Sequence, residues 1–101
     1  MRTEFPRLSG KEFLILELLE DRGEMFGLAM VEASKGELKI GTVYVTLQRM
    51  AEKGLIESRE EARPEGENGT ARRIYQPTGL GKRLLKSQKI ALTFLNLGWE
   101  N

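Results

Sequence analysis

The sequence of 101 residues contains no cysteine and no histidine. Without cysteine there is no disulfide framework, no thiolate nucleophile and no iron–sulfur or cysteine-type zinc site. Without histidine there is no imidazole general base, no Ser-His-Asp triad and no histidine-ligated metal. We therefore expect no catalytic residues, no enzyme activity and no cofactor, although carboxylate-only Mg²⁺ or Ca²⁺ sites stay formally open.

Long apolar runs are also missing. No stretch approaches the roughly 18 consecutive apolar residues of a membrane span, and the N-terminal residues lack the apolar segment of a secretory signal. The composition, 40% hydrophobic and 31% charged, is typical of a globular protein. We expect one small domain with a single core, located in the cytoplasm.

The formal net charge is only +1, but the charges are unevenly distributed. Residues 70–89 carry six basic side chains and no acidic one, and residues 39–54 carry three basic and one acidic. Residues 1–38 and 55–69 are both net acidic. Because a binding face depends on the local field, the near-neutral total does not exclude a nucleic-acid partner.

Three elements are expected in the first part of the chain. Ser9 followed by Glu12 forms a capping box, which predicts a helix over residues 10–22. A second helix is expected over residues 26–35, before a glycine. Residues 38–40 are expected to form a short extended piece, a minimal strand.

The next element has two unlike sides. Thr42 is expected to cap a third helix, which ends at Gly54. Val43, Leu47 and Met50 recur at helical spacing and predict a narrow buried stripe. The opposite side remains free to meet a partner, and it carries Thr42, Val45, Thr46 and Arg49.

The rest of the sequence predicts a hairpin and a final helix. Residues 55–60 and 70–76 have strand character, and the polar, glycine-containing segment 64–69 between them is typical of a turn. Thr78 is expected to cap a last helix. The predicted fold class is mainly α with a small β-hairpin, the order of a winged helix-turn-helix. A surface helix of this kind fits the DNA major groove, about 12 Å wide.

Several motifs in this order carry a family resemblance. They are Phe26-Gly27, the run Gly41-Thr42-Val43-Tyr44-x-x-Leu47-x-Arg49-Met50-x-x-x-Gly54-Leu55-Ile56, and Arg72-Arg73-x-Tyr75-x-x-Thr78-x-x-Gly81. The combination resembles the PadR-like family of bacterial transcriptional regulators over roughly residues 9–85. The resemblance implies a dimeric DNA-binding regulator, usually a repressor, with residues 1–77 as the DNA-binding domain and residues 78–101 as a C-terminal dimerisation helix.

Three features depart from the family pattern. The entry to the last helix, usually Leu-Thr-Glu-x-Gly, is Pro77-Thr78-Gly79-Leu80-Gly81 here. Val45 stands where the family usually has proline after the tyrosine. The first wing strand and the tip are acidic, which disfavours insertion of the tip into the minor groove. We therefore expect Arg63, Arg72 or Arg73 to contact phosphates instead. Because Arg72 and Arg73 alternate along a strand, one should face DNA while the other pairs with a glutamate across the hairpin, Glu57 or Glu60.

The residues predicted to bind DNA are Thr42, Val45, Thr46, Arg49, Arg63, Arg72 and Arg73. Tyr44 lies on the flank of the third helix, where packing at the core edge and a phosphate hydrogen bond are both open.

The last helix is apolar on more than one side, so it needs two partners, its own core and a second subunit. The predicted dimer interface comprises Leu84, Leu85, Ala91, Leu92, Phe94, Leu95 and Trp99. Phe94 and Trp99 would suit a small aromatic effector, although plain dimer packing is the favoured interpretation.

Two functions thus stay open. The first is a homodimeric regulator that binds a double-stranded operator. The second is a winged-helix protein-interaction module without DNA binding, which the acidic wing favours.

Overall fold

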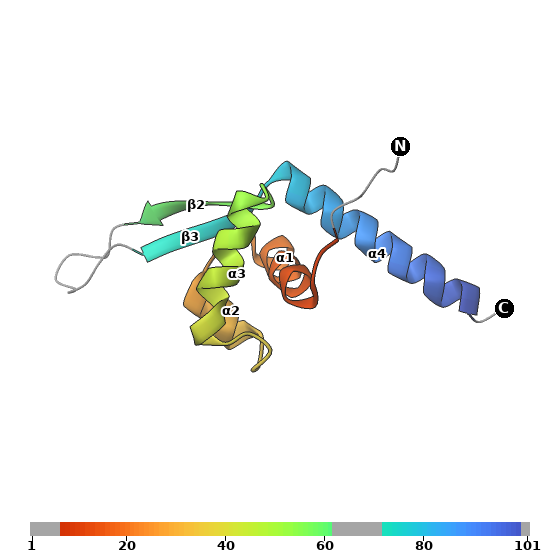
Figure 1. The fold of residues 1–101 in the computed structure, drawn as a ribbon, viewed down its shortest axis with the longest axis horizontal. Coiled ribbons are helices and arrows are strands. Elements are labelled where there is room, and N and C mark those ends of the chain that lie inside the picture. The colour runs from red at the N-terminus through yellow and green to blue at the C-terminus, as the bar shows by residue number, and fades with distance from the viewer. Residues whose placement is uncertain (1–6, 62–71, 100–101) are drawn as a thin grey trace.

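The structure, a computed structural model, describes residues 7–61 and 72–99, with side chains in the last helix described up to residue 95. The described residues form, in order, α1 (Gly10–Arg22), β1 (Met25–Phe26), α2 (Gly27–Ala33), α3 (Ile40–Glu52), β2 (Ile56–Glu61), β3 (Arg72–Pro77) and α4 (Gly79–Trp99). The helices α1, α2 and α3 gather at the centre, and the β2–β3 hairpin and α4 leave this centre in opposite directions (Figure 1). This architecture confirms the predicted fold class.

Helix α1 begins at the predicted capping box. The Ser9 hydroxyl accepts a hydrogen bond from the Glu12 N–H at 3.2 Å, and the Glu12 carboxylate accepts one from the Ser9 N–H at 2.9 Å. The helix ends at Gly23, which has a φ of 86° and donates its N–H to the Leu19 carbonyl at 2.7 Å. Both ends of the predicted helix are therefore confirmed.

The predicted strand at residues 38–40 is wrong. The Leu38 N–H bonds to the Ser34 hydroxyl at 2.9 Å, and Lys39 is the N-cap of α3. The helix starts at Ile40, so the prediction that Thr42 caps it is also wrong. Helical bonding already begins at the Lys39 carbonyl, which accepts the Val43 N–H at 2.8 Å, and this leaves residue 42 inside the first turn.

The third strand lies elsewhere. Residues 25–26, directly after α1, pair with β3, and the antiparallel sheet has the order β1-β3-β2. The register pairs Met25 with Tyr75, and Glu60 with Arg73. Phe26, which was expected to open α2, belongs to this strand. The strand therefore anchors the base of the wing to the helical core from the side opposite β2.

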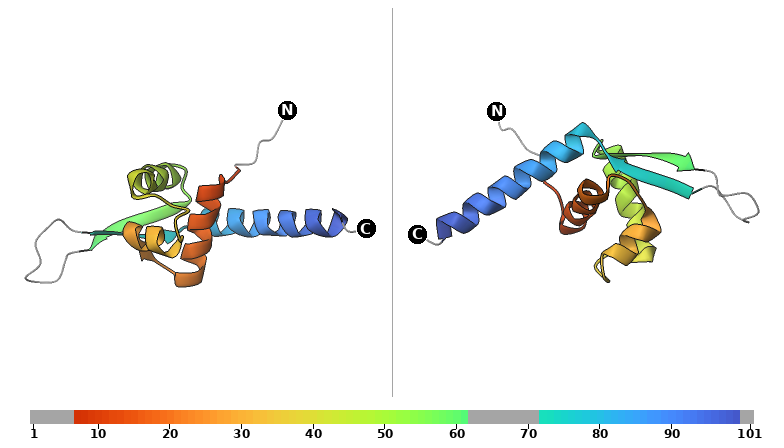
Figure 2. Two further views of the ribbon diagram at one scale, coloured as in Figure 1. Left: turned by 90° about the horizontal axis from the view of Figure 1, so that it is seen from below. Right: turned by 180° about the vertical axis from the view of Figure 1, so that it is seen from behind.

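One core joins all the helices. Its fully buried side chains come from α1, α2, α3, the connecting segments and the first half of α4. They are Ile15, Leu16, Leu19, Met30, Leu38, Val43, Leu47, Met50 and Leu85. Because α4 contributes only Leu85 to this set, most of that helix extends away from the core (Figure 2).

The start of α4 is fixed to the segment after α3. The Thr78 hydroxyl accepts the Gly81 N–H at 3.0 Å, which confirms its predicted capping role, and donates to the Gly54 carbonyl at 2.6 Å. The Thr78 N–H also bonds to the Leu55 carbonyl at 3.0 Å. A side chain at Gly81 would overlap that same carbonyl oxygen. The Thr-x-x-Gly motif is thus a requirement of close packing.

Candidate nucleic-acid interface

Helix α3 has the two predicted sides. Val43, Leu47 and Met50 are buried, whereas Val45 on the opposite side is 51% exposed. Thr42, Gln48 and Arg49 are exposed on the same side. Thr46 is half-buried, and its hydroxyl donates to the Thr42 carbonyl at 3.2 Å. The structure therefore brings the predicted α3 residues to one surface, with Arg49 as its cation.

Tyr44 packs at the edge of the core. A Cβ at Gly27 would lie 2.7 Å from the Tyr44 ring, so the ring sits directly against that glycine. Burial raises the pKa of the neighbouring Tyr75 hydroxyl, and the proximity of Tyr44 adds to this effect. This environment corresponds to the core-edge role, although the Tyr44 side chain remains 45% exposed. The glycine of the Phe-Gly motif makes room for the ring.

The two predicted arginines of β3 take different partners. Arg73 donates hydrogen bonds to the Ser58 hydroxyl at 3.0 Å and to the Glu60 carboxylate at 3.2 Å. The guanidinium of Arg72 lies 4.4 Å from the centre of the Phe26 ring, a cation–π geometry. Arg73 is therefore the member of the pair that binds Glu60 across the hairpin. Arg63 lies outside the described residues.

Arg59 of the wing is, like Arg73, paired with acidic groups. Arg59 donates two hydrogen bonds to Glu24, at 3.0 and 3.2 Å, and lies 3.8 Å from Glu61. The hydrogen bond from Arg59 holds the pKa of the Glu24 carboxyl below its usual value. Within the described part of the wing, the Arg59 and Arg73 cations thus already have carboxylate partners.

The other flank of α3 faces the start of α1. A hollow of about 530 Å³ opens there, and Arg7, Lys11, Arg49 and Lys53 contribute to its walls. Lys53 donates a hydrogen bond of 2.7 Å to Glu12. Arg7, Lys11 and Lys53 are not among the residues predicted from the sequence, because they come from separate segments and stand beside no other cation in the sequence.

The predicted interface residues of α4 fall into two groups. Leu85 is 1% exposed and packs within its own chain, so it is not retained as an interface residue. Leu84 is half-buried, and the remaining described ones are exposed, namely Ala91, Leu92, Phe94 and Leu95. The side chain of Trp99 lies outside the described residues. A groove of about 520 Å³ runs along the side of α4 that carries Leu84, Ala91, Leu92 and Leu95.

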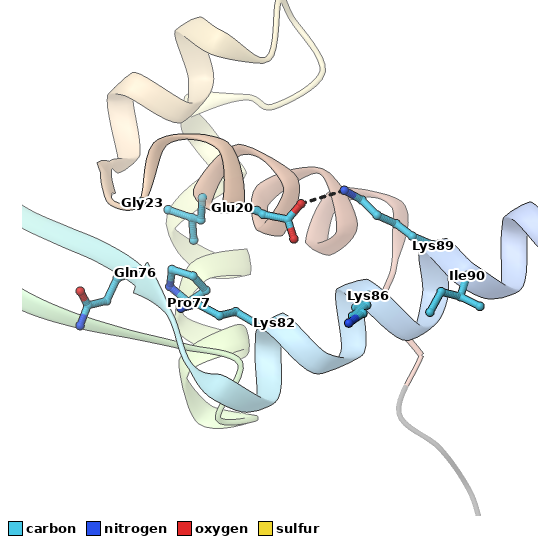
Figure 3. Close-up of a pocket in the computed structure, with 9 residues that line it drawn as sticks. Glu20, Gly23, Gln76, Pro77, Lys82, Lys86, Lys89 and Ile90 are labelled. Atoms are coloured by element: carbon cyan, nitrogen blue, oxygen red, sulfur yellow. Dashed lines mark hydrogen bonds and ion pairs between the residues drawn. The ribbon is translucent and has the colours of Figure 1, made fainter.

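A separate hollow of about 670 Å³ lies between α1, the end of β3 and α4. Lys82, Lys86 and Lys89 follow one side of α4 there, and Lys89 donates to Glu20 of α1 at 3.0 Å (Figure 3). The lining residues come from α1, β3 and α4 and the turn after α1, and none comes from α3. This basic surface is therefore separate from the exposed side of α3.

The described residues hold neither a metal cluster nor a membrane helix. No group of three or more acidic side chains among them is arranged to hold a metal ion. Within residues 7–61 and 72–99, no helix is both long and apolar enough to cross a membrane.

Helices α1, α2 and α3 together with the β2–β3 wing define a winged helix-turn-helix protein, in which α3 leaves one side exposed. The family model described as "Transcriptional regulator PadR-like family" matches residues 15–87. The chain belongs to this family, whose members are DNA-binding regulators and not enzymes. The family therefore agrees with the expectation of no enzyme activity.

Solved structures with the same fold include several regulators of this family. A PadR family transcription regulator from hypervirulent Clostridium difficile is 29% identical, with a TM-score of 0.72, over 88% of this chain and 93% of its own. A regulator of the same family from Eggerthella lenta is 26% identical, with a TM-score of 0.68, over 89% and 78% of the two chains.

Bacillus subtilis PadR, solved in complex with operator DNA, is 23% identical, with a TM-score of 0.72. The match covers 85% of this chain and 49% of that one, and at this identity it shows the fold alone. None of the curated protein sequences matches the chain.

Proposed function

We propose that the chain is a homodimeric repressor that reads a specific double-stranded operator with α3 in the major groove. The observation that carries this proposal is the division of α3 into a buried stripe and an exposed side with Val45 and Arg49. Arginine pairs with guanine, and apolar side chains contact the thymine methyl group, so this side suits base recognition. Thr42, Thr46, Arg72 and Arg73, with Arg63, complete the proposed DNA-binding set.

In this proposal residues 1–77 bind DNA and residues 78–101 form the dimer. The apolar side of α4 supports the second part, because Leu92, Phe94 and Leu95 are exposed in the single chain. A symmetric dimer would place two α3 helices on half-sites about one DNA turn apart. In this proposal Phe94 and Trp99 take part in plain dimer packing, with a small aromatic effector beside them as the alternative. A cytoplasmic location belongs to the same proposal.

The rival function is a winged-helix module that binds another protein instead of DNA. The carboxylates that pair with Arg59 and Arg73 favour it, because they reduce the positive field of the wing.

Selection of bound DNA from a random pool tests the proposal directly. A regulator yields an enriched inverted repeat, and its affinity in a gel shift falls steeply with salt because phosphate contacts release counterions. Absence of any enriched motif together with a flat salt dependence contradicts DNA recognition and supports the rival. Placing the selected site at a promoter then tests repression, since the purified protein should lower transcription from it in vitro.

A further inference from the structure

The hollow between α1 and α3 gathers cations from separate segments. Arg7 precedes α1, Lys11 lies in its first turn, and Arg49 and Lys53 lie in and just after the last turn of α3. We refer to Arg7, Lys11, Arg49 and Lys53 as the α1–α3 basic groove. Thr46 and Arg49 of α3 both line the groove, so the groove is continuous with the exposed side of α3.

Among the contacts of the described residues, only those of Lys53 give a cation of this groove a clear structural role. It bonds to the Glu12 carboxylate at 2.7 Å, and the other oxygen of that carboxylate accepts the Ser9 N–H. No carboxylate among the described residues lies within ion-pair distance of Arg7, Lys11 or Arg49. Three cations thus face the groove without a described acidic partner.

Lys11 does not stabilise the fold through the helix dipole. A cation in the first turn of a helix lies at the positive end of that dipole, where it is unfavourable. The capping box already satisfies the N–H groups of Ser9 and Glu12 at this end of the helix. A lysine that opposes its own helix and has no described acidic partner is better explained by an external anion.

The groove lies on the flank of α3 away from the wing. Tyr44 packs toward Gly27 at the base of the wing, whereas Thr46 lines the groove. Residues two positions apart in a helix, such as Tyr44 and Thr46, point in directions that differ by about 160° around the helix axis. The two flanks are therefore nearly opposite. A duplex on the exposed side of α3 therefore meets the wing on one flank and the groove on the other.

We propose that the α1–α3 basic groove binds the phosphodiester backbone of the operator, with Lys11 and Arg7 as its phosphate contacts and Arg49 between backbone and bases. Arginine and lysine are the side chains that bind phosphates in this way. In this proposal the groove supplies phosphate contacts that Arg59 and Arg73 of the wing make only weakly, because both are paired with carboxylates. This proposal rests on the proposed DNA-binding function.

The test compares Lys11→Ala with Lys86→Ala, which removes the same charge from an exposed site of α4. Fluorescence anisotropy measures the affinity of each full-length variant for the selected operator and for an unrelated duplex between 50 and 300 mM salt. For Lys11→Ala we expect both affinities to fall by the same factor, roughly tenfold per lost contact near 0.1 M salt, and the salt slope to decrease by about 0.9 per contact. Arg7→Ala, which lies outside α1, should give the same pattern.

A melting curve separates this role from a structural one, because Lys11→Ala should melt at or above the wild-type temperature. If both groove variants retain the salt slope and affinity of Lys86→Ala, the groove proposal is overturned while DNA binding stands. If the wild-type protein itself shows no salt-dependent DNA binding, the proposed function fails first.

Discussion

Arg73 and Glu60 lie directly opposite each other on β3 and β2, and the guanidinium donates a hydrogen bond of 3.2 Å to the carboxylate. Both side chains are about half exposed or more, so the pair adds little to the free energy of unfolding. Its main effect is electrostatic, because the carboxylate neutralises a cation at the place where a wing would meet a phosphate.

Replacing Glu60 should therefore strengthen DNA binding. We expect Glu60→Gln to free the Arg73 guanidinium and to raise DNA affinity severalfold at low salt, with a steeper salt dependence. The matched control is Glu57→Gln, which removes the same charge from a side chain bonded to Gln76. Equal affinities of the two variants in a salt titration would show that Arg73 does not reach DNA.

Arg49 is expected to discriminate between bases. A bidentate arginine–guanine contact contributes about 1–3 kcal/mol of discrimination. We expect Arg49→Ala to bind the selected operator more weakly and to lose preference at one position of each half-site, as measured by gel shift on single-base operator variants. Gln48→Ala, at a neighbouring exposed position, is the control. Unchanged base preference of Arg49→Ala at every operator position would contradict a base contact.

Buried and exposed leucines of α4 should respond differently to mutation. Leu95 is 57% exposed, so Leu95→Glu should leave the fold intact and convert the dimer to a monomer, as measured by light scattering. Leu85 is buried, so Leu85→Ala should lower the free energy of unfolding by about 2–5 kcal/mol without changing the dimer's mass. A wild-type protein that is monomeric at micromolar concentration would refute the assignment.

Two glycines at the start of α4 provide a matched pair. Gly81→Ala would overlap the Leu55 carbonyl oxygen and should destabilise the protein by about 1–3 kcal/mol or more. A Cβ at Gly79 meets only the end of the Arg83 side chain, at 3.4 Å, so Gly79→Ala should stabilise by about 0.4–1 kcal/mol. Melting temperatures at equal concentration give the comparison, and a reversed order would refute the packing argument.

Glu12 should link stability to acid pH. Burial raises its pKa, but hydrogen bonds from Lys53 and Ser9 outweigh this effect, so the pKa lies below the ordinary value of 4.5. Because the pKa of Glu12 is lower in the folded protein than in the unfolded chain, its charged form stabilises the fold at pH values above the unfolded-state pKa. This stabilisation is lost as the pH falls through the folded-state pKa.

Glu12→Gln can keep the capping box but loses the charged bond to Lys53. We expect it to be about 1–2 kcal/mol less stable than wild type at pH 7, with the difference shrinking once acid protonates Glu12. Denaturant unfolding at a series of pH values measures this, with exposed Glu37→Gln as the control. A difference that is constant with pH would exclude the charge as its source.

Much of the fold could be predicted because local chemistry determines it. The capping box at Ser9 and the glycine at residue 23 define α1, and the spacing of Val43, Leu47 and Met50 defines the buried side of α3. These signals lie within a few residues of the elements they specify, so periodicity and capping rules detect them.

What could not be predicted depends on contacts between distant residues. The two-residue strand β1 is too short for an alternating pattern and exists because β3 offers it a free edge. The choice of Arg73 as the partner of Glu60 depends on strand register, which the sequence of the hairpin leaves open. The α1–α3 basic groove brings together cations up to 46 positions apart, from Arg7 to Lys53, which no local pattern connects.

The joint around Thr78 has a mechanical consequence for the proposed dimer. The Thr78 hydroxyl bonds to Gly54, two residues after α3, and to Gly81 in the first turn of α4, and Gly81 packs directly against Leu55. These contacts fix the start of α4 to the end of α3, so we expect the two helices to move together in the proposed dimer. A change in the angle between the two α4 helices would then shift both α3 helices together. The proposed dimer interface would therefore set the spacing between the two DNA half-sites.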